Sequence, residues 1–211
     1  MRTDDLIADL AESPVATARP SLRIVGAMLG GWLVALVALL LVLGAPLASL
    51  SQTGMLPFGV KSGFAIAFLA ASVSAAIAAG RPGKKLSLRL ALIAVPFLAL
   101  LALMTLELSS TPRGNWGGLF FGTTYMSCIA AITLASLPVL VSTLWAYREM
   151  APTRPALAGL LAGLSSGAAA AVAYALYCPE TTASFLLAAY TPAALAPAVA
   201  GWLLGPRLLR W

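Results

Sequence analysis

The stretch APTRPALAGLLAGLSSGAAAAVAYALYCPE, residues 151–180, organises the rest of the chain. Small residues recur at every fourth position within it: Gly159, Gly163, Gly167, Ala171 and Ala175. Because residues four apart share one face of a helix, they predict a smooth ridge that a neighbouring backbone approaches closely. Cys178 follows Ala171 by seven residues, so we expect it on the same face. Pro179 then ends the helix.

The composition of the whole chain is that of a polytopic membrane protein. Of 211 residues, 61% are hydrophobic and 9% charged, and the mean hydropathy is +0.95. Stretches long enough to cross about 30 Å of hydrocarbon occupy residues 24–45, 60–79, 88–106, 120–146, 156–177 and 184–205. The predicted fold is therefore all-α, a bundle of six transmembrane helices (24–211) preceded by a separate N-terminal tail (1–23).

The basic residues predict the orientation of this bundle. Threading six helices places most of them on one side: Arg2, Arg19, Arg23, Arg81, Lys84, Lys85, Arg89, Arg148, Arg154, Arg207 and Arg210. Only Lys61 and Arg113 fall on the other side. Since cytoplasmic loops carry the excess of Lys and Arg, we expect both termini on the cytoplasmic side of a bacterial inner membrane. The net charge of +6 then reflects topology and contact with membrane lipid, not nucleic-acid binding.

The N-terminal tail has the pattern of a short amphipathic helix that ends at Pro14. Its four acids and lack of a hydrophobic run are unlike a cleaved signal peptide, so we expect it to be retained. Thr3 is the expected N-cap, with acids in the first turn, where the helix dipole favours them. Leu6, Ile7 and Leu10 form an apolar stripe beside an acidic one of Asp5, Asp9 and Glu12. The candidate binding residues are Thr3, Asp4, Asp5, Leu6, Ile7, Asp9 and Leu10.

A helix of two to three turns is too short to be stable alone, so it orders only against a partner. Anionic lipid would repel the acidic stripe, whereas a basic protein surface suits it. The alternative is a disordered tail whose amphipathicity is accidental.

The two cysteines are the candidate chemical groups of the bundle. Cys128 lies on a small-residue face of the fourth span, and counting residues from the inner side places both thiols near the outer surface. Their depths differ by on the order of 7 Å, so a disulfide requires helix tilt or the turn at Pro179. Three interpretations of the cysteines are open: inert core residues, a redox pair, or ligands of a soft metal. Of the two functional interpretations, redox sensing is preferred. Without His, a metal would need Met126, Glu180, backbone or water as further ligands, and no cofactor is predicted.

Most enzyme classes lack their residues in this sequence. There is no histidine, no glycine loop of a nucleotide site and no carboxylate pair, so we expect no enzyme. None of the 20 Lys, Arg, Asp and Glu residues lies in the middle of a predicted span, where ion-coupled transporters normally carry one. A small-molecule transporter or channel and a membrane thiol oxidoreductase remain as alternatives. The first would need a polar path between helices, and the second a reactive pair with a charged activator.

Several segments together resemble the NrsF family of six-helix bacterial membrane anti-sigma factors, over essentially the whole length. They are the opening TDDLIADLA, the Cys in the fourth span, APTRPALAGLLAG, Cys-Pro-Glu after the fifth span and the closing GPRLLRW. The resemblance implies that the tail holds an extracytoplasmic-function sigma factor of the sigma-F kind at the cytoplasmic face. It also implies release under oxidative or heavy-metal stress, with Cys128 and Cys178 as the sensing thiols. The chain departs from the family at Tyr177, where members commonly carry His.

Overall fold

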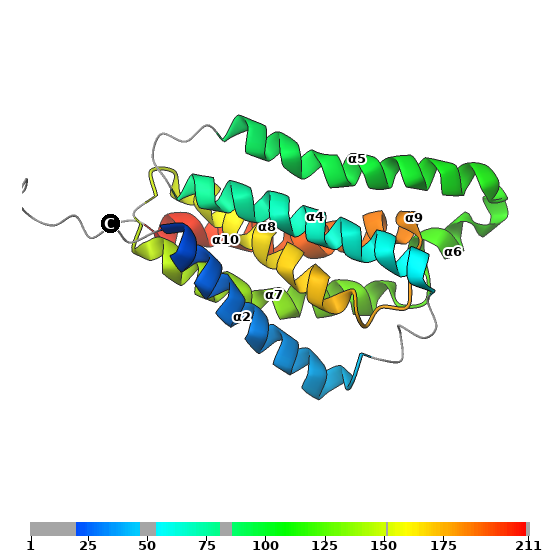
Figure 1. Cartoon of the computed structure of the whole chain (residues 1–211), viewed down its shortest axis with the longest axis horizontal. Coiled ribbons are helices and arrows are strands. Elements are labelled where there is room, and N and C mark those ends of the chain that lie inside the picture. The colour runs from blue at the N-terminus through cyan, green and yellow to red at the C-terminus, as the bar shows by residue number, and fades with distance from the viewer. Residues whose placement is uncertain (1–19, 47–53, 81–85, 151, 210–211) are drawn as a thin grey trace, which may run out of the picture.

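The computed structural model describes residues 20–46, 54–80, 86–150 and 152–209, and within these ranges every regular element is a helix (Figure 1). In chain order the elements are α2 (Pro20–Leu43), α4 (Met55–Ala79), α5 (Ser87–Ser110), η1 (Arg113–Asn115), α6 (Trp116–Phe121), α7 (Tyr125–Arg148), α8 (Pro155–Tyr174), α9 (Ala183–Phe185), the π-helical turn η2 (Leu186–Tyr190) and α10 (Thr191–Leu208).

The prediction of six helices that are long and apolar enough to span a membrane is confirmed. Among the described residues, six helical segments are long and apolar enough to cross a membrane: Ser21–Leu43, Met55–Ala79, Ser87–Ser110, Arg113–Arg148, Pro155–Tyr174 and Ala183–Leu208. The largest differences are at two starts: the fourth span begins at Arg113 rather than residue 120, and the second at Met55 rather than residue 60. Helix α8 also differs at its end, because it stops at Tyr174 rather than at the predicted residue 177. Pro179 disfavours the helical conformation at the residue before it, so the chain leaves the helix through turns before reaching it.

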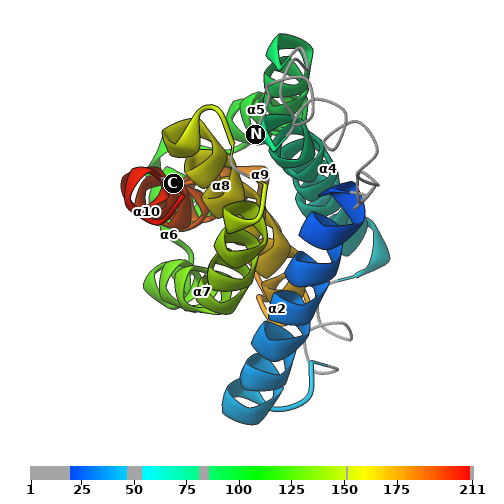
Figure 2. The same cartoon turned by 90° about the vertical axis from the view of Figure 1, so that its left-hand side faces the viewer.

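Helix α8 forms the centre of the bundle, as its small-residue ridge predicts. It packs against α10, α7, α4 and α2 (Figure 2). In the apolar segment of α8, 72% of the residues are buried, whereas the corresponding share for α5 is 11%. Helix α5 lies at the side of the bundle against α4 and α9. The inside and the outside of the bundle are therefore distinguished by residue size, because both are apolar.

The ridge of α8 meets a matching ridge on α10. Gly159 lies against Gly201, and Gly163 lies against the backbone of Pro197 and Ala198. A methyl group at either glycine of α8 would overlap backbone atoms of α10. The two helices thus approach at a distance that only glycine permits, whereas the sequence predicted a close neighbour without identifying it.

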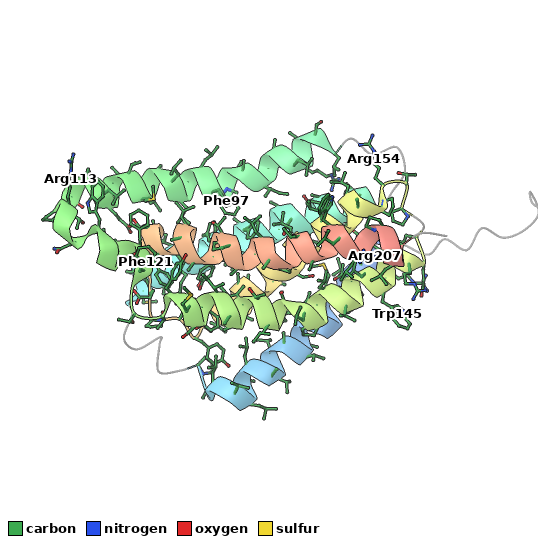
Figure 3. All side chains as sticks on the ribbon, turned by 180° about the vertical axis from the view of Figure 1, so that it is seen from behind. Phe97, Arg113, Phe121, Trp145, Arg154 and Arg207 are labelled. Carbon is green, nitrogen blue, oxygen red and sulfur yellow. The ribbon has the colours of Figure 1, made fainter. Side chains whose placement is uncertain are left out.

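The bundle has two chemically different ends. At one, here called the basic end, α2, α5 and α8 begin and α4, α7 and α10 end; its described arginines are Arg23, Arg89, Arg148, Arg154 and Arg207. At the opposite end, here called the cysteine end, lie Lys61, Arg113, Cys128 and Cys178. Figure 3 displays the separation: Arg154 and Arg207 lie at one end and Arg113 at the other.

The basic end is held by contacts between helices that are distant in sequence. Arg23 in the first turn of α2 forms an ion pair with Glu149, directly after α7. The buried Tyr147 hydroxyl of α7 donates to the Ala76 carbonyl oxygen of α4 at 2.5 Å. Further along the bundle, Trp32 of α2 donates to the Ala169 carbonyl oxygen of α8. The start of α2, where the N-terminal tail joins, is thereby fixed to the end of α7.

Candidate functional site

The cysteine end brings the two thiols into contact. The Sγ atoms of Cys128 and Cys178 lie 3.2 Å apart, and both residues are free cysteines with no exposed surface. The offset in depth expected from straight helices is closed by the turns at residues 175–177, which follow the early end of α8. A disulfide bond is about 2.05 Å long, so the sulfur atoms need to move by roughly 1 Å to form one.

The two cysteines occupy different kinds of backbone. Cys128 is in the first turn of α7, where its amide donates to the Thr124 carbonyl oxygen and its sulfur lies 3.7 Å from the Thr124 hydroxyl. Cys178 lies outside regular helix, between α8 and α9, and its amide donates a hydrogen bond to the Tyr174 carbonyl oxygen. The next residue, Pro179, is exposed. The pair therefore joins a rigid helix to an irregular segment at the surface.

A lysine that the sequence placed with the outer cations is part of this site. Because α4 begins at Met55, Lys61 lies inside the helix rather than at its start, and its side chain has no exposed surface. Its ammonium nitrogen donates to the Cys178 carbonyl oxygen at 2.5 Å and lies 5.7 Å from the centre of the Phe58 ring. A buried lysine needs a partner. The sequence contained a signal for this role, because Lys61 is the single cation at the start of an apolar span of small residues.

Two glutamates clamp the segment that carries Cys178. Glu180 accepts hydrogen bonds from the Thr123 amide at 2.9 Å and from the Thr123 hydroxyl at 3.1 Å. Glycine is required at the neighbouring position 122 for two reasons: its φ is +47°, and a Cβ there would overlap the Glu180 carboxylate. The carboxylate is therefore held on the backbone that leads into α7.

The second clamp comes from Glu107 near the end of α5. Its carboxylate accepts from the amides of Ala183 and Ser184 at 2.7 and 3.0 Å and from the Ser184 hydroxyl. A carboxylate at the first turn of α9 satisfies amides that have no partner within the helix. Residues 178–184 are thus attached to α4, α5 and the start of α7 at once.

Tyrosine side chains complete the surroundings of the thiols. The Tyr190 hydroxyl, in η2, is buried and lies beside both cysteines. The Tyr177 hydroxyl is buried and unpartnered, and its ring stacks on Tyr174 with centres 6.5 Å apart. Tyr177 therefore packs beside the pair as an aromatic group.

The surroundings favour the thiolate of Cys178. The hydrogen bond with the Cys128 thiol lowers the pKa of Cys178 to about 7, although burial opposes this change. The backbone of Glu180 and the charge of Lys61 act in the same direction as the Cys128 hydrogen bond. A thiolate in contact with a second thiol is the reactive form for disulfide chemistry.

The additional metal ligands considered from the sequence do not gather here. Met126 is 75% exposed, and the Glu180 carboxylate is bound to Thr123. Among the described residues, no group of three or more His, Cys, Asp and Glu side chains is placed to hold a metal ion. The geometry at Cys128 and Cys178 is thus that of a dithiol pair.

Three grooves border α2, and their walls bear on the transporter alternative. One lies between α2 and α7 near Ala35 and Ala131, one runs along Trp32 toward α4 and α8, and one lies near Gly31 and Trp145. No charged side chain lines any of these three grooves. They are apolar surfaces, so none of these three grooves is part of a polar path.

The predicted binding residues of the tail, Thr3, Asp4, Asp5, Leu6, Ile7, Asp9 and Leu10, lie outside the described residues. The nearest described feature is the ion pair of Arg23 with Glu149 at the basic end.

Comparison with known proteins identifies the family. The family model described as negative regulator of sigma F matches residues 7–211. A probable anti-sigma-F factor NrsF of Azospira oryzae is 39% identical over 213 residues, covering all of both chains. The anti-sigma-F factor NrsF of Caulobacter vibrioides is 46% identical over 93 residues, 44% of each chain. No solved structure matches. The match over nearly the whole chain, with a full-length relative, shows that this protein belongs to the NrsF family, a family of regulatory proteins that act negatively on sigma F.

Proposed function

We propose that this protein is an anti-sigma factor of the bacterial inner membrane that holds a sigma factor at the cytoplasmic face and releases it when Cys128 and Cys178 form a disulfide. The sigma factor is of the extracytoplasmic-function type and of the sigma-F kind. Family membership and the names of the two relatives support the anti-sigma activity. The observation that carries the sensing step is the 3.2 Å contact between the two buried sulfur atoms.

The binding step is assigned to the N-terminal tail. Sigma factors must contact DNA phosphate, so they present basic surfaces that an acidic helix can cover. The acids Asp5, Asp9 and Glu12 attract that surface, and Leu6, Ile7 and Leu10 bury apolar area against it. We assign this end, and with it both termini, to the cytoplasm, because cytoplasmic ends of membrane proteins carry the excess of Lys and Arg.

The sensing step then takes place at the outer, oxidising side of the membrane, because the cysteine end is opposite the basic end. The clamps on residues 178–184 connect movement of Cys178 to α4, α5 and the start of α7. Helix α7 carries Cys128 in its first turn and ends at Arg148, directly before Glu149, which pairs with Arg23 at the end of the tail. Forming the disulfide therefore displaces the start of α7, and the opposite end of this helix is linked through the Glu149–Arg23 ion pair to the end of the binding tail.

The experiment follows thiols and transcription together in intact cells. Cells are exposed to an oxidant, quenched with acid and treated with a maleimide that adds mass to each free thiol, while transcripts of the target genes are measured. We expect two maleimide additions before exposure and none at the moment of induction. Induction while both thiols remain free would refute the disulfide mechanism and favour metal binding. A protein that does not retain any sigma factor in pull-down would refute the anti-sigma assignment itself.

A further inference from the structure

The two thiols of the pair have unequal surroundings, and Lys61 contributes to the difference between them. Its ammonium is fully buried and is held on the main chain of Cys178, not of Cys128. Of its three N–H groups, one donates to the Cys178 carbonyl oxygen. A buried ammonium favours a nearby anion strongly, because little water remains to screen it.

The carboxylates of this end are already occupied. Glu180 is bound by Thr123, and Glu107 by the amides of Ala183 and Ser184. Among the described residues, the acidic groups that act on Lys61 are Glu180 and the two thiols, so the group that can gain negative charge there is a thiol. The titratable and polar groups that face the pair are Lys61 from α4, Thr124 directly before α7, Tyr174 from α8, Glu180 from the connecting segment and Tyr190 from η2.

We propose that Lys61 is a positioning residue that makes Cys178 the attacking thiolate and leaves Cys128 as the resolving thiol. This inference rests on the proposed function of the pair as a redox sensor. Cys178 also lies in irregular backbone beside the exposed Pro179, where local opening costs less than unwinding the first turn of α7. Electrostatics and access therefore select the same thiol.

The chemistry that this order implies begins with a hydroperoxide as the oxidant. The Cys178 thiol loses its proton to water, and the thiolate attacks the terminal peroxide oxygen, which breaks the O–O bond. Sulfur is oxidised by two electrons to sulfenic acid, and the leaving oxygen takes a proton to become water or an alcohol. The Cys128 sulfur then attacks the Cys178 sulfur, the S–S bond forms, and the hydroxyl leaves as a second water together with the Cys128 proton.

The test uses purified full-length protein in lipid nanodiscs with hydrogen peroxide, and dimedone to trap sulfenic acid. In Cys128→Ser, which lacks the resolving thiol but keeps a hydroxyl that can donate to the Cys178 sulfur, Cys178 should be trapped at neutral pH. In Cys178→Ser, we expect trapping at Cys128 to be about tenfold slower or more, the ratio of one pKa unit. This comparison leaves Lys61 untouched. Equal or faster trapping at Cys128 would overturn the order of attack.

The role of Lys61 is tested within the Cys128→Ser background. Adding Lys61→Met should slow trapping of Cys178 by about tenfold and raise the pH midpoint of its alkylation by about one unit, whereas Lys61→Arg should keep both close to the parent. Arg113→Met, which removes the other outer cation, is the matched control, because Arg113 stacks on Trp116 and not on the thiols. An unchanged midpoint in Lys61→Met, or no recovery in Lys61→Arg, would overturn the assignment. Because no sigma factor is present, these outcomes are independent of whether the disulfide releases one.

Discussion

Cys128 and Cys178 are fifty positions apart in the chain, yet their sulfur atoms are in contact inside the bundle. Such a contact exists because α8 ends before Cys178 and the chain turns back toward the first turn of α7. A thiol pair that is buried, reduced and close to bonding distance needs only a small displacement to become covalent.

The first prediction is that Cys128→Ser and Cys178→Ser each abolish induction of the target genes by oxidant. Serine nearly matches cysteine in volume, and the Thr124 hydroxyl or the Glu180 carbonyl oxygen is available to its hydroxyl group. Both variants should therefore fold, insert and still repress. Reporter transcription and pull-down of the sigma factor measure the two properties separately, and normal induction in either variant would contradict the sensor model.

The second prediction concerns pH. The hydrogen bond with Cys128 lowers the pKa of the Cys178 thiol to about 7, so the thiolate is scarce below that pH and predominant above it. The rate of Cys178 alkylation should rise as pH increases through about 7 and then level off. In denatured protein the same rate should continue to rise until about pH 8.5, the ordinary range of a thiol. Identical profiles for the folded and denatured protein would show that the folded surroundings do not favour the thiolate.

The sequence predicted the number of spans and the central position of residues 156–177 because membrane helices follow length, hydropathy and small-residue spacing. It did not predict the partner of the glycine ridge, since α10 offers Gly201 and Gly205 among prolines that obscure their spacing. The contact between the thiols depends on the residue at which α8 ends and the chain turns. Counting residues along straight helices does not predict that position. The burial of Lys61 was missed for a related reason, because α4 begins earlier than its hydropathy indicates.

The third prediction concerns the packing of α8 against α10. Gly163→Leu places a side chain where the backbone of Pro197 and Ala198 already lies. Overpacking of this kind costs about 1–3 kcal/mol or more when the backbone must move. Gly63→Leu in α4 is the matched control, because nothing lies near a Cβ at that position. The midpoint temperature of unfolding in detergent should fall for Gly163→Leu alone, and equal midpoints would contradict the close approach.

The fourth prediction is that salt weakens the complex with the sigma factor. The acidic stripe Asp5, Asp9 and Glu12 acts through charges at the surface of the tail, and the Debye length falls from about 10 Å at 0.1 M salt to about 3 Å at 1 M. Affinity should decrease with ionic strength to a residual value carried by apolar contacts. Titration of sigma factor onto nanodisc-bound protein measures this, and an affinity that is flat or rises with salt would remove the electrostatic contribution.

The fifth prediction is that an acid within the apolar stripe of the tail releases the sigma factor without affecting the bundle. Leu6→Asp or Ile7→Asp would bury an unpaired carboxylate against the partner, at a cost of several kcal/mol that the short helix cannot recover elsewhere. The target genes should then be transcribed without any oxidant, while membrane insertion is unchanged because the tail precedes the first span.

Ala8→Asp provides the control for this tail experiment. It introduces the same charge at a position that helical periodicity turns away from Leu6 and Leu10. The control should retain the sigma factor in pull-down, and the added acid should not weaken attraction to a basic surface. If all three variants bind equally well, the stripe is not the contact face. If all three lose binding, the tail is recognised by its overall charge or extended backbone rather than as an amphipathic helix.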